Sequence, residues 1–199
     1  MTTRLLLVRH GESNATVERR IAGMLTCTGL SALGVRQAER LRDRLATGHE
    51  VPVDALWTSP MPRALQTATI VNEVLGLDTQ VDPDLEEHRP GESDGMRFDD
   101  IIAKFGPPQA DLPPHARYLP GSESTADFHY RVGAAVHRLV EGNAGKTVLV
   151  TCHGGVIDVA FRAMLHLPMR GQFDLWTLNT SITEFASGHQ PGRLPTRWR

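Results

Sequence analysis

The sequence predicts an α/β fold in which parallel strands are joined by helices. Strand-like and helix-like stretches alternate along the chain, which is typical of this class. Two apolar runs, residues 5–8 and 148–151, resemble strands buried on both faces, and each leads after one further residue into a His-Gly pair. The length of 199 residues suits a single domain over residues 1–199, with roughly 70% of its unfolded surface buried.

The first strand–helix unit begins at the run over residues 5–8. Residues 11–30 are polar and contain glycine, so we expect them to form a connection on the surface. Ser31 is a candidate N-cap for a helix that ends near Gly48. Apolar residues of this helix recur at spacings of three and four, at Ala38, Leu41 and Leu45.

A second unit pairs a short strand at residues 54–57 with another helix. Pro60 and Pro62 stand where a helix begins, and apolar residues continue at helical spacing up to Gly76, a typical C′ residue. This arrangement places Arg63 in the first helical turn, just beyond the carboxyl end of a strand.

A long excursion interrupts the alternation between residues 84 and 121. Six prolines between Pro90 and Pro120 prevent any long helix or strand there. We expect this segment to form a loop or cap over the active edge of the sheet, because long loops in compact domains usually carry function.

The C-terminal part resumes the pattern. Ser124 begins a capping-box pattern ahead of a helix, and that helix leads into a strand at residues 147–151. Further elements are predicted in this order: a helix from residue 154, strands at 173–178 and 181–186, and a flexible tail over residues 188–199.

The balance of charge disfavours partners that are recruited by a strong electric field. With 21 basic and 23 acidic residues, the net charge is −2, and we expect neither nucleic acid nor a membrane as a partner. The apolar run at 5–8 is too short for a signal peptide, and no 18-residue apolar stretch exists, so we expect a cytoplasmic protein. Cys27 and Cys152 lack metal-ligand spacing and are expected to be free thiols.

Several residues are delivered to one edge of the predicted sheet. Arg9 and His10 follow the first strand, Arg63 follows the second, and His153 follows a later one. Two guanidinium groups and two imidazoles there would bind a tetrahedral dianion such as a phosphoryl group. The chain has no phosphate-binding glycine loop and no paired metal ligands, so we expect neither a metal nor a cofactor.

Histidine can itself be the nucleophile in phosphoryl transfer, provided that it is neutral. Neighbouring arginine charges lower the pKa of an imidazole, which would keep His10 neutral. The leaving alkoxide then needs a proton donor, and Glu86 and Glu87 are both candidates. Cys152 is adjacent to His153, but neighbouring residues on a strand point to opposite faces, so we expect a structural, buried cysteine.

The chain closely resembles the histidine phosphatase superfamily, also called the phosphoglycerate mutase-like family. The matching motifs, in chain order, are LVRHGES at residues 7–13, TSPMPRALQTA at 58–68, LEE at 85–87 and HGG at 153–155. Smaller matches fall between and after them, so that the resemblance covers nearly the whole chain. The family fold is a three-layer α/β/α sandwich around a mostly parallel sheet with an antiparallel edge strand.

The resemblance also implies roles for individual residues. His10 would be the nucleophile that becomes phosphorylated, and Arg9, Arg63 and His153 would hold the phosphoryl group. Glu87 would donate the proton and later activate water. Many members carry an asparagine six residues after the nucleophile, where this chain has Thr16. The nearest asparagine is Asn14, which is a further candidate for contact with phosphate.

The leading hypothesis is a metal-independent phosphomonoester hydrolase that acts on a small phosphorylated substrate. A cofactor-dependent phosphoglycerate mutase is the first alternative, but such mutases carry a longer insertion than the 65 residues between Glu87 and His153. A catalytically silent binding module on the same fold is a second alternative, which the complete set of site residues disfavours. The sequence leaves the substrate and the oligomeric state open, with a homodimer as one option.

Overall fold

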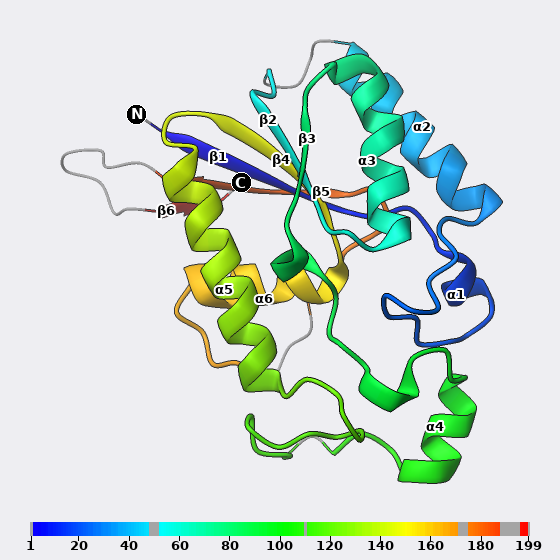
Figure 1. Cartoon of the computed structure of the whole chain (residues 1–199). Coiled ribbons are helices and arrows are strands. Elements are labelled where there is room, and N and C mark those ends of the chain that lie inside the picture. Colours follow the sequence, from blue (N-terminus) through cyan, green and yellow to red (C-terminus); the bar gives the residue numbers. More distant parts are fainter. Residues whose placement is uncertain (1, 48–51, 110, 171–174, 188–195, 199) are drawn as a thin grey trace.

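A six-stranded sheet runs through the centre of the molecule in the order β3-β2-β4-β1-β5-β6 (Figure 1). The structure is a computed structural model that describes residues 2–47, 52–109, 111–170, 175–187 and 196–198. The first four strands in the sheet order are parallel, whereas β5 is antiparallel to β1 and β6 is antiparallel to β5. The strands are β1 (Thr3–Arg9), β2 (Ala55–Thr58), β3 (Thr79–Val81), β4 (Thr147–Cys152), β5 (Ile182–Ser187) and β6 (Thr196–Trp198).

Helices cover both faces of this sheet and complete a three-layer sandwich (Figure 1). One layer consists of α2 (Ala32–Ala46) and α3 (Pro62–Leu75), and the other of α5 (Thr125–Gly142) and α6 (Gly154–Met164). The predicted fold class is therefore confirmed. The antiparallel part is larger than expected, because β6 extends the sheet beyond β5.

Strand β1 shows why its sequence is apolar at successive positions. Leu5 and Leu7 pack into the core beneath α5 and α6, whereas Leu6 and Val8 pack into the separate core beneath α2 and α3. Side chains of a strand alternate between its two faces, so a strand that is covered on both sides needs apolar residues throughout. All four side chains are at most 4% exposed.

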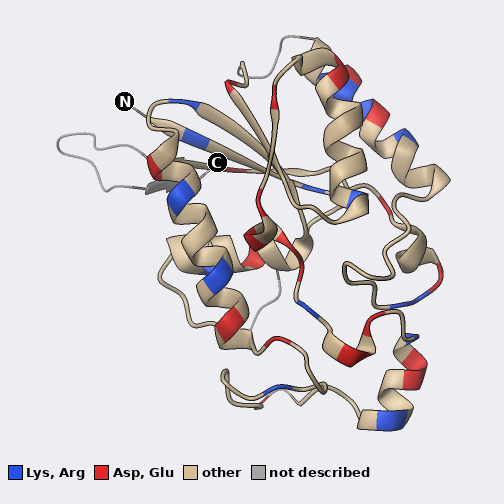
Figure 2. Cartoon of the chain, viewed as in Figure 1, with Lys and Arg blue, Asp and Glu red and all other residues tan. Residues whose placement is uncertain are grey.

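Several predicted helix signals are confirmed, namely the starts of α2, α3 and α5 and the end of α3. The Ser31 hydroxyl caps α2, α3 starts at Pro62, and Gly76 ends α3 in the left-handed conformation with φ of 62°. Ser124 and Asp127 form a complete capping box at the start of α5. Basic and acidic residues are interspersed along α2 (Figure 2), so its charged face presents no single sign of charge.

The excursion packs against the connection that follows β1. The excursion contains two short 3₁₀ turns, Pro83–Leu85 and Gly91–Ser93, followed by the helix α4 (Phe98–Phe105). The connection after β1 contains one short helix, α1 (Asn14–Val17). Backbone hydrogen bonds join the two segments, from Ile21 N to Met96 O at 3.0 Å and from Gly95 N to Ile21 O at 2.7 Å. The two connections thus support each other beyond the carboxyl end of β1, the strand that His10 follows.

Near the C-terminus, the structure describes parts of the predicted strand at 173–178 and of the predicted tail at 188–199. The predicted strand at 173–178 is wrong over residues 175–178, which form no strand, and residues 171–174 lie outside the described residues. Here the Thr177 carbonyl accepts a hydrogen bond from Arg9, so this backbone serves the site instead of a sheet ladder. Within the predicted tail, residues 196–198 form β6, while residues 188–195 and 199 lie outside the described part, as does Gly48.

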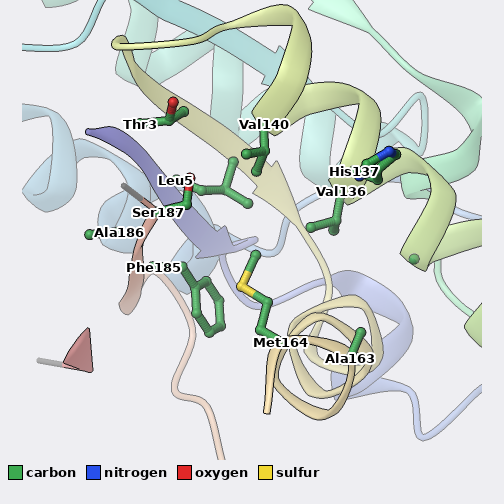
Figure 3. Close-up of a pocket in the computed structure, with 11 residues that line it drawn as sticks. Thr3, Leu5, Val136, His137, Val140, Ala163, Met164, Phe185, Ala186 and Ser187 are labelled. Atoms are coloured by element: carbon green, nitrogen blue, oxygen red, sulfur yellow. The ribbon is translucent and has the colours of Figure 1, made fainter. Parts of the chain in front are cut away.

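A cavity of about 300 Å³ lies between α5, α6 and the antiparallel side of the sheet (Figure 3). Leu5, Val136, Met164 and Phe185 line it, and Thr3 places it near the start of β1, away from His10. None of the helices in the described residues is long and apolar enough to cross a membrane.

The first turn of α2 touches the backbone that follows His10, and this contact gives a test of the fold. A Cβ atom at Gly34 would lie 2.0 Å from the carbonyl oxygen of Glu12. We expect Gly34→Ala to lower the free energy of unfolding by about 1–3 kcal/mol, because two backbones must move apart. Denaturant unfolding followed by circular dichroism measures the change.

Gly133→Ala is the matched control, since a Cβ at this position in α5 meets nothing within 4 Å. This change should raise stability by about 0.5–1 kcal/mol through the helix propensity of alanine. A Gly34→Ala protein as stable as the wild type would show that the close backbone approach is not required.

Candidate active site

Two parallel strands in register bring the two histidines together. Arg9 of β1 pairs with Cys152 of β4, and His10 and His153 are the next residues on each strand. The His10 backbone N–H donates to the Cys152 carbonyl at 3.0 Å, which continues the ladder by one step. The two ring centroids lie 5.1 Å apart in an edge-to-face arrangement. The strand ends therefore place both imidazoles in one site, as the sequence predicts.

The hydrogen bonds of His10 define its tautomer. Nδ1 lies 2.6 Å from the Gly11 carbonyl oxygen, which can only accept a hydrogen bond, so Nδ1 carries the proton. The Arg63 Nε–H donates to Nε2 at 3.1 Å, and Nε2 therefore presents its lone pair. The Asn179 side-chain amide donates to the His10 carbonyl at 2.8 Å and fixes the backbone. Nε2 is thus the unprotonated nitrogen of this ring.

His10 is held neutral mainly by burial. Its side chain is only 6% exposed, and burial lowers its pKa from 6.5 to about 3, with further contributions from the positive charges of Arg63 and Arg9. The sequence prediction attributed this effect to the arginine charges. The structure corrects the order of the causes, because loss of hydration is the larger one.

His153 is completely buried directly beside His10. Its Nε2 lies 2.9 Å from the Ser59 hydroxyl, which also accepts the Met61 backbone N–H at 3.2 Å. The hydroxyl proton is then free to bond Nε2, which places the imidazole proton on Nδ1. That nitrogen has no hydrogen-bond partner among the described residues. Burial, followed by the Arg63 charge, lowers the pKa of His153 well below its usual value.

Arg63 is held at the first turn of α3 by several acceptors. In addition to His10, its guanidinium bonds the Ala22 carbonyl at 2.9 Å and the Cys27 sulfur at 3.4 Å. Arg9 donates from Nη1 to the Thr177 carbonyl, whereas its buried Nε has no partner among the described residues. Both cations thus face the imidazoles while keeping N–H groups available for an anion.

Of the two carboxylate candidates, Glu86 and Glu87, only Glu87 is among the residues that line the cavity. Glu87 lines the same cavity as His10, and its carboxylate accepts the backbone N–H groups of Gly155 and His88, each at 3.0 Å. The Gly155 N–H belongs to the first turn of α6, so the start of this helix positions the Glu87 side chain. Glu86 instead bonds Arg89 at 2.9 Å and is absent from the cavity wall.

Gly155 explains part of the HGG motif in a way that the sequence did not predict. Both glycines appeared suited to close approach of a ligand. A Cβ at Gly155 would instead lie 2.2 Å from the Glu87 Oε1 atom, so the missing side chain makes room for this carboxylate. At Gly154 a Cβ would meet only ordinary contacts, the nearest at 3.5 Å.

A cavity of about 290 Å³ opens in front of these groups. Arg9, His10, Arg63 and Glu87 line it together, and the two supporting connections supply the rest of the wall, called here the outer wall. The other lining residues are Ser13, Ala15, Thr16, Arg20, Ile21, Ala22, His88, Pro90, Phe98 and Leu119. His153 is not among these lining residues, but its ring lies edge-to-face with that of His10.

Asn14 is not brought to this cavity. Its side-chain amide donates to the Thr28 hydroxyl at 3.3 Å, while Thr16 occupies the wall and bonds the Ser13 hydroxyl at 2.9 Å. Within the described residues, no group of three or more His, Cys, Asp or Glu side chains is arranged to hold a metal ion. Cys152 is fully buried in the core under α5 and α6, and burial raises the pKa of its thiol.

Comparison with known proteins identifies the family of this chain. A family model for the histidine phosphatase superfamily (branch 1) matches residues 5–196. The chain belongs to the histidine phosphatase superfamily. Among solved structures, Bacillus stearothermophilus YhfR superposes with a TM-score of 0.82 at 32% identity, over 94% of this chain and 92% of that one. Mycobacterial glucosyl-3-phosphoglycerate phosphatase superposes with a TM-score of 0.75 at 27% identity, over 100% and 97% of the two chains.

Superfamily relatives with named activities fall into two groups. A glucosyl-3-phosphoglycerate phosphatase of Mycolicibacterium vanbaalenii is 31% identical over 98% of this chain and 92% of that protein. A 2,3-bisphosphoglycerate-dependent phosphoglycerate mutase of Chelativorans sp. is 35% identical over 77% of each chain. The bifunctional protein Rv2228c of Mycobacterium tuberculosis is 34% identical over 96% of this chain, which spans about half, 53%, of that relative.

Two supporting residues of this histidine phosphatase site were not predicted as functional. Ser59 bonds His153, and Asn179 bonds the His10 backbone. Both lie in motifs that the sequence analysis matched to the superfamily, but their side chains have no chemistry that singles them out. Only the spacing of Ser59, just after β2 and next to the ends of β1 and β4, indicates that it reaches the site.

The lowered pKa of His10 makes stability depend on pH. Below pH about 6.5 the unfolded chain protonates this residue, whereas the folded protein does so only near pH 3. The unfolded state therefore binds the additional proton, and stability falls as the pH drops through this window. Between pH 7 and pH 5 the loss from His10 alone should be about 2 kcal/mol.

His10→Gln removes this titration and serves as the comparison. Urea unfolding of both proteins at pH 7 and pH 5 should show that the variant loses less stability than the wild type. Other titrating groups, including His153, are present in both proteins and cancel. An equal loss in the two proteins would contradict the burial argument.

Proposed function

We propose that this protein is a phosphomonoester hydrolase that works through a phosphohistidine on His10. The observation that carries the proposal is the unprotonated Nε2 of His10, whose lone pair accepts the Arg63 Nε–H at 3.1 Å in the cavity that both residues line. A phosphoryl group entering the cavity would take over the Arg63 donor and free the lone pair for attack. Arg9 and the His153 Nδ1–H supply further donors for the phosphoryl oxygens.

The reaction takes two steps in this geometry. In the first, Nε2 of His10 bonds to phosphorus, the ester P–O bond breaks, and the Glu87 carboxyl gives its proton to the leaving oxygen. In the second, the Glu87 carboxylate takes a proton from water as the water oxygen bonds to phosphorus. The P–N bond then breaks and inorganic phosphate leaves. The arginines balance the charge that spreads over the phosphoryl oxygens in both transition states.

A phosphoglycerate mutase is the second candidate, and the mutase relatives at about a third identity support it. The first half-reaction is the same, so the catalytic residues do not distinguish the two. The 65 residues between Glu87 and His153 favour hydrolysis. A silent binding module is disfavoured, because His10, Arg9, Arg63 and Glu87 all line one cavity.

The cavity suggests a compact substrate. Its volume of about 290 Å³ suits a small phosphorylated metabolite, and Ile21, Phe98 and Leu119 give the outer wall an apolar portion. Arg20 offers a positive charge in the same wall. We place the activity in the cytoplasm, which the two free thiols, Cys27 and Cys152, favour.

His10→Ala should lower kcat on any hydrolysed phosphomonoester by several orders of magnitude, because the nucleophile is lost. Acid-labile, base-stable labelling of the wild type by a ³²P-labelled substrate, absent from the variant, would detect the phosphoramidate on His10. Circular dichroism and melting check that the variant folds. Undiminished turnover in a folded His10→Ala protein would refute the mechanism.

A turnover panel separates hydrolysis from mutase activity. Sugar phosphates, nucleotides and phosphoglyceric acids are assayed for phosphate release in EDTA, and 3-phosphoglycerate is assayed with and without 2,3-bisphosphoglycerate. We expect phosphate release that survives EDTA, since the arginines supply the positive charge. Efficient formation of 2-phosphoglycerate would favour the mutase, and activity restored only by added metal would contradict the arginine-based mechanism.

A further inference from the structure

Arg131 of α5 binds the backbone of the segment that carries Glu87. Its side chain is 8% exposed, and Nη1 donates to the carbonyl oxygens of Asp84 at 2.8 Å and Glu86 at 3.0 Å. Nη2 donates to the carbonyl oxygen of Glu87 itself at 3.4 Å. One guanidinium thus holds three carbonyls within four consecutive residues.

Glu123 completes this arrangement from the other side. Its two carboxylate oxygens accept Nε and Nη2 of Arg131 at 2.8 and 2.7 Å, a paired contact with both side chains under 10% exposed. Glu123 also bonds the Arg89 backbone in both directions, accepting N–H at 3.3 Å and donating its own to the carbonyl at 2.9 Å. The segment from Asp84 to Arg89 is therefore tied at both ends to one buried ion pair.

Arg131 stabilises the charged form of Glu123. Burial by itself would raise the pKa of Glu123, but the hydrogen bonds and positive charge of Arg131 outweigh it and hold the pKa below its usual value. A buried pair of this kind is costly to break on one side only, since the remaining charge loses its partner.

We propose that the Glu123–Arg131 ion pair is a positioning element for the proton donor, placing the Glu87 carboxyl at the leaving-group side of the cavity. This inference rests on the proposed function. The proposed phosphoryl-binding groups Arg9 and Arg63 come from β1 and α3, and among the described residues no hydrogen bond joins either of them to Arg131. A change in the pair therefore shifts proton donation while leaving the phosphoryl group bound.

The leaving group provides a readout that a purely structural role would not move. An alkyl phosphate releases a strongly basic alkoxide and depends on the general acid, whereas nitrophenolate leaves without a proton. Displacement of a catalytic group by about 1 Å can cost about 10²-fold in rate. Loss of the pair should therefore affect alkyl phosphates far more than p-nitrophenyl phosphate.

Two variants test this in the full-length protein. Arg131→Lys keeps the charge but cannot span Glu123 and three carbonyls, and the double variant Arg131→Met with Glu123→Gln leaves no unpaired buried charge. Both should lower kcat/KM for the best alkyl phosphate of the panel by about 10–100-fold. For p-nitrophenyl phosphate the fall should stay under about threefold, with little change in inhibition by inorganic phosphate.

Arg138→Met is the matched control. Arg138 lies on the same helix and pairs with the same segment, through the Asp82 and Asp84 carboxylates at 3.1 and 2.7 Å, but its side chain is 52% exposed and touches no carbonyl near Glu87. We expect its kinetics on both substrates to match the wild type. Melting temperatures of all variants check folding, and the double variant covers the case in which Arg131→Lys is unstable.

A double-mutant cycle with Glu87→Gln assigns the effect to Glu87. If the pair acts through this carboxyl, the Arg131 change adds less than about threefold in the Glu87→Gln background. Additive losses, or equal losses on alkyl and nitrophenyl phosphates, would overturn the inference while leaving the hydrolase proposal intact. Turnover that survives His10→Ala, or a wild type that hydrolyses nothing, would overturn the hydrolase proposal and this inference with it.

Discussion

The pairing register of β1 with β4 is the constraint on which the site depends. Arg9 lies opposite Cys152, so the residue that follows each of them is a histidine. Both rings lie on the α3 side of the sheet, where Arg63 donates a hydrogen bond to His10. A slip of one residue would turn the side chains of β1 to the other face. The two apolar cores prevent it, because each β1 side chain already fills a place on its own side of the sheet.

Burial of the two histidines also sets their charge state. It keeps His10 and His153 neutral, and an unprotonated imidazole is what attack on phosphorus requires. The arginines add to this effect and also supply the donors for the anion. The site therefore costs folding free energy, because two neutral imidazoles and two cations are packed where little water reaches them. A bound dianion would offset this cost by pairing with the two arginines.

Much of this site is predictable from the sequence, because strand ends and motifs specify where His10, Arg63 and His153 must lie. The supporting residues were harder to find. Arg131 stands three residues after Phe128 and four before Ala135, on the buried stripe of α5, and a charge at such a position must find a partner inside. The sequence thus carries a signal for Arg131. The predicted strand is wrong over residues 175–178, because local pattern does not reveal which backbone serves the site, and the role of Asn14 stays a prediction.

The central place of β4 has a consequence for how the protein is made. This strand lies between β1 and β2, yet it is synthesised after both of them and after the whole excursion. A nascent chain that ends before residue 147 lacks both the second imidazole, on His153, and the strand β4 that aligns the first. Its β1 and β2 would have no shared neighbour, and such non-local pairing forms slowly. The proposed phosphoryl chemistry at His10 therefore requires that synthesis has passed β4 and that this last parallel strand has inserted between the other two.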